Sequence, residues 1–221
     1  KRDNDDPSVN SLNEQTQVGF VHRFFRVDPG ERGTLILCVL CFFFLLFWYF
    51  LLRPLREAMG VQRSMGDLRW LFLVTCAVSL GVTLVFGGVV TRFDRRRFIP
   101  IAFRAVMACL VVFMILQMQL GEQVRLYAGY VFYVWLSVIN LFMMSVFWAF
   151  MADIWSLPQG KRLFATIGVG GTLGAFLGSN FVWWLADQVQ PWMQMGIALV
   201  MFELCVQTVR LIDRRSHQHS N

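Results

Sequence analysis

Long apolar segments alternate with short polar ones along most of this chain. Six of the apolar segments are long enough to cross a hydrocarbon core about 30 Å thick, because an α-helix rises about 1.5 Å per residue. These segments are residues 33–52, 70–90, 98–120, 126–152, 163–186 and 192–212. Their apolar residues run continuously and do not alternate with polar ones, which predicts membrane helices and not the strands of a membrane barrel.

The composition supports a membrane protein. With 57% hydrophobic and 15% charged residues, the chain has more apolar surface than a soluble domain of 221 residues needs for one core. We therefore expect an all-α membrane protein whose six-helix transmembrane domain covers residues 33–212. Residues 1–32 predict a cytoplasmic tail without a cleavable signal peptide, with an interfacial segment over residues 18–31. Residues 213–221 predict a second cytoplasmic tail.

Basic residues are distributed unequally between the two sides of the membrane that these segments define. One side carries Arg23, Arg26, Arg32, Arg92, Arg95, Arg96, Arg97, Lys161, Arg162, Arg210, Arg214 and Arg215. The other side carries only Arg53, Arg56, Arg63, Arg69 and Arg125. Because cytoplasmic loops hold the excess of Lys and Arg, we expect both termini in the cytoplasm. The expected location of the protein is a bacterial inner membrane. Anionic headgroups account for the net charge of +6, so no nucleic acid polymer is expected as a partner.

The stretch FWYFLLRPLRE, residues 47–57, places two arginines where the first apolar segment ends. Arg53 and Arg56 are three residues apart, so their side chains project from one helix face. Two forked guanidinium groups at this position would bind a phosphate or a carboxylate. Alternatively, both arginines snorkel to the headgroups and only anchor the helix. Pro54 interrupts the helix hydrogen bonding between them and is expected to open the helix end.

Two further charges lie inside apolar segments. Arg104 in the third segment and Glu203 in the sixth are at similar depth, roughly 9 to 14 Å from the cytoplasmic edge. Glu203 could be a proton or substrate site, because ionisable groups inside membranes are often functional. We expect instead that the two residues pair, since each then offsets the burial cost of the other. Gln207, one turn from Glu203, could join the pair.

The fifth segment contains GVGGTLGAFLG, in which Gly170, Gly174 and Gly178 stand four residues apart. Residues at this spacing share one helix face, and small residues there let two membrane helices approach closely. A phosphate-binding loop would need a preceding strand and a following Lys-Ser/Thr pair, and neither is present. We therefore expect tight helix packing along this face.

The ends of the first and fourth segments are similar. FWYFLLR at residues 47–53 and FWAFMAD at residues 147–153 share Phe, Trp and Phe at the same spacing, and they face opposite sides of the membrane. This is the pattern that a 3+3 inverted repeat produces. A chain with 22 Phe and 8 Trp can also produce it by chance.

The loop GGVVTRFDRRRF, residues 87–98, resembles the signature G-x-x-x-D-R-x-G-R-R of the major facilitator transporters. The residues in register with it are Gly87, Arg92, Arg95 and Arg96. Thr91 replaces the aspartate of the signature, and Asp94 replaces its glycine. The resemblance implies a charged latch against neighbouring helix ends, in which Asp94 supplies the displaced carboxylate. The alternative is an ordinary basic cytoplasmic loop.

Three segments resemble the nucleotide transporter (ATP:ADP antiporter) family and its bacterial relatives in the major facilitator superfamily. They are YFLLRPLREAMG after the first apolar segment, FWAFMADIWSLPQGKRLFATIG after the fourth, and the glycine-rich start of the fifth. The resemblance covers most of residues 29–186. It implies that the chain is the amino-terminal six-span half of a major-facilitator-type fold, in which the first span lines a central cavity.

This resemblance also implies roles for single residues. Arg56 matches a basic residue implicated in handling substrate phosphates, and Arg53 and Glu57 fill the neighbouring positions of the block. The family carries a functional glutamate in the fourth span, where this chain offers only Ser137 and Asn140 as polar groups, so strict ATP:ADP exchange does not follow. We expect Asn140 among the substrate-binding residues, with Arg53, Arg56 and Glu57. The residues of the second block with an implied structural or gating role are Asp153, Lys161 and Arg162.

Together these features predict a secondary active transporter that moves an anionic solute, nucleotide-like by resemblance, by alternating access. The alternative is a non-transporting membrane subunit or scaffold. We expect no enzyme, cofactor or metal, because no nucleophile and base constellation and no metal-ligand spacing is present. The expected partners are an anionic small molecule, the lipid bilayer, and a second six-helix half or a second copy.

Overall fold

The computed structural model describes residues 31–60, 65–90, 95–119, 121–185 and 188–218, which form six helices and no strand. The helices are α2 (Arg32–Gly60), α3 (Met65–Val90), α4 (Arg95–Gln119), α5 (Glu122–Ile154), α6 (Leu157–Leu185) and α7 (Pro191–Gln218). All except α3, whose described apolar stretch is the shorter Arg69–Val82, are long and apolar enough to cross a membrane. The predicted all-α class is confirmed for the described residues, and five of the six expected spans are helices long and apolar enough to cross a membrane. Helix α7 extends into residues 213–218, which were expected to belong to a tail.

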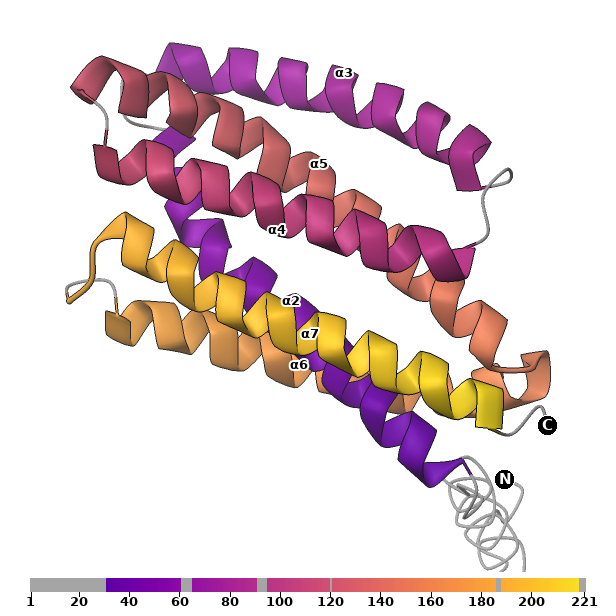
Figure 1. Cartoon of the computed structure of the whole chain (residues 1–221). Coiled ribbons are helices and arrows are strands. Elements are labelled where there is room, and N and C mark those ends of the chain that lie inside the picture. The colour runs from indigo at the N-terminus through magenta and orange to yellow at the C-terminus, as the bar shows by residue number, and fades with distance from the viewer. Residues whose placement is uncertain (1–30, 61–64, 91–94, 120, 186–187, 219–221) are drawn as a thin grey trace, which may run out of the picture.

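Helix α2 lies at the centre of the bundle and packs against α5, α6 and α7. Figure 1 shows it crossing behind α7, with α3, α4 and α5 to one side and α6 to the other. Phe42 stacks on Phe147 of α5 with ring centroids 4.5 Å apart, and Trp48 lies against Phe202 of α7 at 4.7 Å. In a membrane such close packing, and not the exclusion of water, holds helices together. The aromatic contacts therefore fix α2 between its neighbours.

Glycines form the contact between α2 and α6. A Cβ atom added to Gly174 would collide with the carbonyl oxygen of Phe43, and one added to Gly178 would lie 2.8 Å from that of Phe47. Gly170 meets α2 in the same way, one turn earlier on both helices. Only the missing side chains allow the two backbones to approach so closely. The tight packing predicted from the glycine spacing is confirmed, and the two helices run in the same direction.

Helix α2 does not end near Pro54, as the apolar pattern suggested, but continues to Gly60. Proline removes one backbone hydrogen bond and normally kinks or breaks a helix. Leu51 and Leu55, on either side of the proline, are 0% and 8% exposed, so neighbouring helices cover this face of the turn, whereas Pro54 itself is exposed. Packing keeps the helix continuous, and Arg56 consequently projects from a helix and not from a loop.

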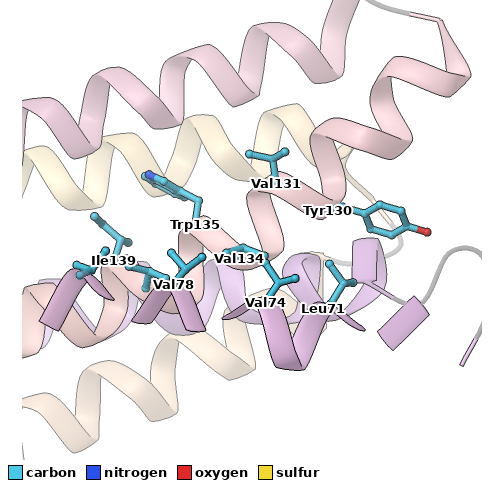
Figure 2. A pocket seen from close by; sticks show the side chains of 10 residues that line it. Leu71, Val74, Val78, Tyr130, Val131, Val134, Trp135 and Ile139 are labelled. Carbon is cyan, nitrogen blue, oxygen red and sulfur yellow. The ribbon is translucent and has the colours of Figure 1, made fainter. Parts of the chain in front are cut away.

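Helices α3 and α5 enclose an open apolar groove of about 560 Å³. Figure 2 shows Leu71 near Tyr130 at one end of the groove and Val78 near Ile139 further along, so α3 and α5 run in the same direction. The other lining residues are Val74, Val82, Val131, Val134, Trp135 and Val138. A surface of this composition is suited to acyl chains or apolar helices and offers little to a charged solute.

Candidate functional site

A cluster of polar side chains lies where α2 contacts α5. Arg56 Nη1 donates a hydrogen bond to the hydroxyl oxygen of Ser137 at 2.9 Å, and Arg56 Nη2 pairs with the carboxylate of Glu57. The central guanidinium carbon lies 4.8 Å from the ring centroid of Tyr133. Ser137 donates its own hydrogen to the carbonyl of Tyr133 at 2.7 Å. These contacts hold the guanidinium in one orientation by hydrogen bonding, ion pairing and cation–π attraction.

Burial distinguishes the members of this Arg56 cluster. The side chain of Arg56 is 13% exposed and that of Glu57 is 44% exposed. Arg56 Nε is buried and has no hydrogen-bond partner in the part of the chain that the structure describes. A guanidinium has five N–H donors. A cation inside membrane helices is costly, and such residues commonly have a function. The cluster therefore holds a fixed, mostly buried cation beside a carboxylate that is 44% exposed.

Arg53 is not part of this cluster. Its side chain is exposed, and its guanidinium carbon lies 5.6 Å from the ring centroid of Phe50 on the same helix. The structure therefore does not bring Arg53 and Arg56 to a common partner among the described residues. Asn140 is half-buried on α5, one turn beyond Ser137, and makes no hydrogen bond within the described ranges.

A buried amide contacts α2 next to its proline. Gln194 of α7, which is 9% exposed, donates a hydrogen bond from Nε2 to the carbonyl oxygen of Leu51 at 2.6 Å. The sequence analysis did not single out this residue. In the sequence, the residue is recognisable only as a glutamine among the apolar residues at the start of a helix. This pattern does not indicate which group the glutamine binds. Only the packing of α7 on α2 shows what the amide binds.

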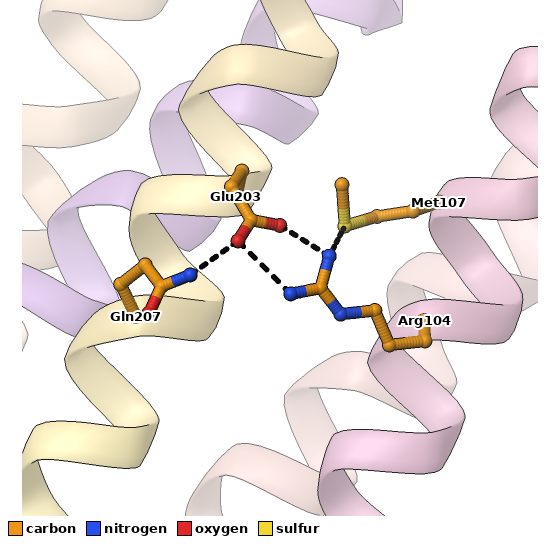
Figure 3. Close-up of polar contacts among 4 residues, drawn as sticks. All are labelled: Arg104, Met107, Glu203 and Gln207. Atoms are coloured by element: carbon orange, nitrogen blue, oxygen red, sulfur yellow. Dashed lines mark hydrogen bonds and ion pairs between the residues drawn. The ribbon is translucent and has the colours of Figure 1, made fainter.

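Arg104 of α4 and Glu203 of α7 form a two-point ion pair, as expected from their similar depth. The N···O distances are 2.6 Å for Nη1 and 3.0 Å for Nη2, and Gln207 donates to the same carboxylate. Figure 3 shows the pair between the two helices, with the sulfur of Met107 also near the guanidinium. The pairing that we predicted is present, which favours a structural role over a proton site.

A third ion pair, which was not predicted, joins the start of α2 to α6. Arg162 Nη2 lies 2.6 Å from Glu31 Oε2, and Gln159 donates to Glu31 Oε1 at 2.6 Å. Glu31 stands directly before α2, and both partners lie in the first turns of α6. Lys161, the other member of the basic pair, is exposed. Asp153, near the end of α5, is also exposed.

Several predicted residues fall outside the described part of the structure. Arg92 and Asp94 lie in the undescribed residues 91–94, and the side chains of Arg95 and Arg96 at the start of α4 are likewise not described. The charged latch expected in this loop therefore stays a prediction. The interfacial segment over residues 18–31 lies outside the described residues except for Glu31.

Thiols supply the remaining buried reactive groups. Cys41 of α2 and Cys205 of α7 are fully buried with their sulfurs 3.7 Å apart, and Cys38 is buried one turn away.

Among the residues described, no three His, Cys, Asp or Glu side chains are grouped so that they could hold a metal ion. The Arg56 cluster, with its part-buried cation, is the candidate site for a solute. Comparison with protein-family models, with curated proteins and with solved structures finds no match for this chain.

Proposed function

We propose that this protein is a secondary transporter of an anionic solute and that Arg56 binds the anion. The observation that carries the proposal is the Arg56 cluster, in which a cation on a membrane-length helix is 13% exposed and held by three residues. Ionisable groups inside membrane bundles commonly mark the path of a substrate or an ion. The helix that carries Arg56 is also the central one of the bundle.

Anion binding would proceed by exchange of the carboxylate that faces Arg56. In the absence of solute, Glu57 neutralises the guanidinium at Nη2. A phosphate or carboxylate of the solute would compete with Glu57 for Nη2, because both groups accept charge-assisted hydrogen bonds from a guanidinium. Ser137 and Tyr133 would hold the guanidinium during the exchange. Asn140, one turn from Ser137 on the same face of α5, would contact the rest of the solute.

The proposal includes six membrane spans, with α3 as the second, arranged as the amino-terminal half of a major-facilitator-type fold. When a chain crosses the membrane at every span, its first and fourth spans are antiparallel, and its first and fifth spans are parallel. The α2–α5 and α2–α6 contacts run in these directions, which supports the proposal. The proposal also includes a second half or a second copy of the chain and cytoplasmic termini. It further includes a nucleotide-like solute, which rests on sequence resemblance alone.

A second candidate function is a non-transporting membrane subunit. Arg56 already has a counter-ion in Glu57 and an acceptor in Ser137, so the cluster could serve only to tie α2 to α5. In that case no solute would compete for the guanidinium. Loss of Arg56 would then lower stability without affecting any transport.

Uptake by proteoliposomes that contain the full protein separates these two functions. Labelled ATP, ADP and succinate serve as probes, and rates are normalised to inserted protein. We expect Arg56→Gln to reduce uptake at least about tenfold, whereas Arg56→Lys retains part of it because it keeps the charge but loses the fork. Arg69→Gln, which removes an exposed cation on α3, is the matched control. Equal uptake by the wild type and Arg56→Gln would refute the proposed role of Arg56.

A further inference from the structure

We propose that Gln194 is a positioning residue for Arg56 and acts through the backbone of α2, an inference that rests on the proposed anion site. Gln194 lies on α7 and does not contact the Arg56 cluster by any hydrogen bond among the described residues. Its Nε2 donates to the carbonyl of Leu51 at 2.6 Å. That carbonyl lies three residues before Pro54 and five before Arg56.

The need for this contact arises from Pro54. Proline has no N–H, so it cannot donate to the carbonyl of Phe50, and its ring crowds the preceding turn. In membrane helices, side chains of neighbouring helices commonly compensate for such a disruption. Gln194 supplies an additional donor to this turn from outside the helix. It binds the carbonyl next to the one that loses its donor and so stabilises the turn that Pro54 disrupts.

The two ends of this turn are held by different helices. On the amino-terminal side of Pro54, Gln194 binds the α2 backbone to α7. On the carboxy-terminal side, Arg56 binds α2 to α5 through Ser137 at 2.9 Å. Rotation of α2 at the proline would move the guanidinium relative to Ser137 and Tyr133. The Gln194 contact restricts that rotation and so fixes where Arg56 presents its donors.

The chemistry of the residue supports a specific role. Gln194 is one of only two polar residues, with Thr208, among the buried side chains described. An amide placed at 9% exposure in an apolar bundle is costly unless it is hydrogen-bonded. Met has nearly the same length and volume and would fill the same space without this cost. The amide is therefore best explained by the carbonyl that it binds.

The test uses a pair of spin labels that report the position of the α2 end. Cysteines replace Ala58 on α2 and Ser145 on α5, which are both exposed, after the exposed Cys76 and Cys109 are changed to Ser. Pulsed electron paramagnetic resonance then measures the distance distribution between the labels. We expect Gln194→Met to broaden or shift this distribution. Adding Pro54→Ala should restore the original distribution, because an N–H at residue 54 rebuilds the helix bond to Phe50.

An unchanged distribution in Gln194→Met would overturn the inference, and so would a double variant that stays as broad as the single one. If Gln194→Met gives no folded protein, recovery of folded protein by adding Pro54→Ala supports the inference, and failure to recover it counts against it. Neither measurement involves a solute, so both remain decisive even if Arg56 binds no anion.

Uptake kinetics test the link to the anion site. In a protein that transports ATP, ADP or succinate, Gln194→Met should raise KM about tenfold with kcat within about twofold, as expected when positioning of a binding group is lost. Pro54→Ala should reverse much of this increase. An unchanged KM together with a changed label distance would overturn the positioning role of Gln194.

Discussion

Arg104 and Glu203 face each other across α4 and α7 in a two-point ion pair, although 99 residues separate them in the chain. Their side chains are 43% and 31% exposed, so the pair lies at the surface of the helix bundle and not in its core. Within a membrane this surface borders lipid or another protein segment, where an unpaired charge is costly. The pair therefore has a structural explanation that requires no transported proton.

The first prediction concerns this pair. Arg104→Leu or Glu203→Leu alone should lower the free energy of unfolding by about 1–3 kcal/mol, because each leaves a charge without its partner, and the partial exposure reduces the cost below that of a fully buried pair. The double variant should recover most of the loss. Chemical unfolding in detergent measures all three, with Gln207→Met as a control that removes a hydrogen bond but no charge. Simple additivity of the two single losses would show that the residues are not coupled.

The second prediction concerns the glycine contact between α2 and α6. Gly174→Ala should destabilise the protein by about 1–3 kcal/mol, because its Cβ would collide with backbone atoms of Phe43, which cannot move aside as a side chain can. Gly168→Ala on the same helix is the matched control, since a Cβ there meets nothing within 4 Å. Thermal unfolding of the two variants gives the comparison. Similar unfolding temperatures for both would contradict the close approach of the two helices.

The third prediction concerns the ion pair that joins α2 to α6. Arg162→Leu leaves the carboxylate of Glu31, which is 15% exposed, without its cation and should lower folded yield. Lys161→Leu removes the adjacent but exposed cation and should have little effect. Exchanging the two charges, as Glu31→Arg with Arg162→Glu, should restore part of the yield. A larger loss from Lys161→Leu than from Arg162→Leu would argue against this pairing.

The fourth prediction concerns Glu57 in the proposed anion site. If the carboxylate of Glu57 competes with the solute for Arg56, then Glu57→Gln should lower the KM for the anion several-fold, since the amide is a weaker competitor. Uptake of the labelled probes at graded concentrations measures this change. An increase in KM would mean that Glu57 helps to hold Arg56 in place and is not a competitor.

The fifth prediction concerns topology. Ser156 precedes α6 and Gln188 follows it, and both are exposed. With Cys76 and Cys109 changed to Ser, Ser156→Cys should react with an impermeant thiol reagent only from the cytoplasmic side, and Gln188→Cys only from the opposite side. Labelling of intact cells and of inverted vesicles distinguishes the two. Reaction of both positions from one side would contradict a membrane-spanning α6.

The helices themselves follow from local sequence. In hydrocarbon every backbone N–H and C=O must find a partner within the protein, and an α-helix satisfies them within one apolar segment, independently of the rest of the chain. The glycine spacing in α6 likewise identified a close helix contact, because three small residues on one face have few other uses. The similar depth of Arg104 and Glu203 was sufficient to predict their pairing.

Tertiary packing decided the other contacts between charged and polar side chains. Arg53 and Arg56 share a helix face by spacing, yet only Arg56 turns onto α5, because the rotation of α2 against its neighbours separates their surroundings. Glu31 and Arg162 are 131 residues apart, and Gln194 and Leu51 are 143 apart. No local pattern can encode such contacts, since they depend on how helices are placed side by side. The sequence determined that this chain forms apolar helices, and the packing around α2 decided which charged and polar groups meet.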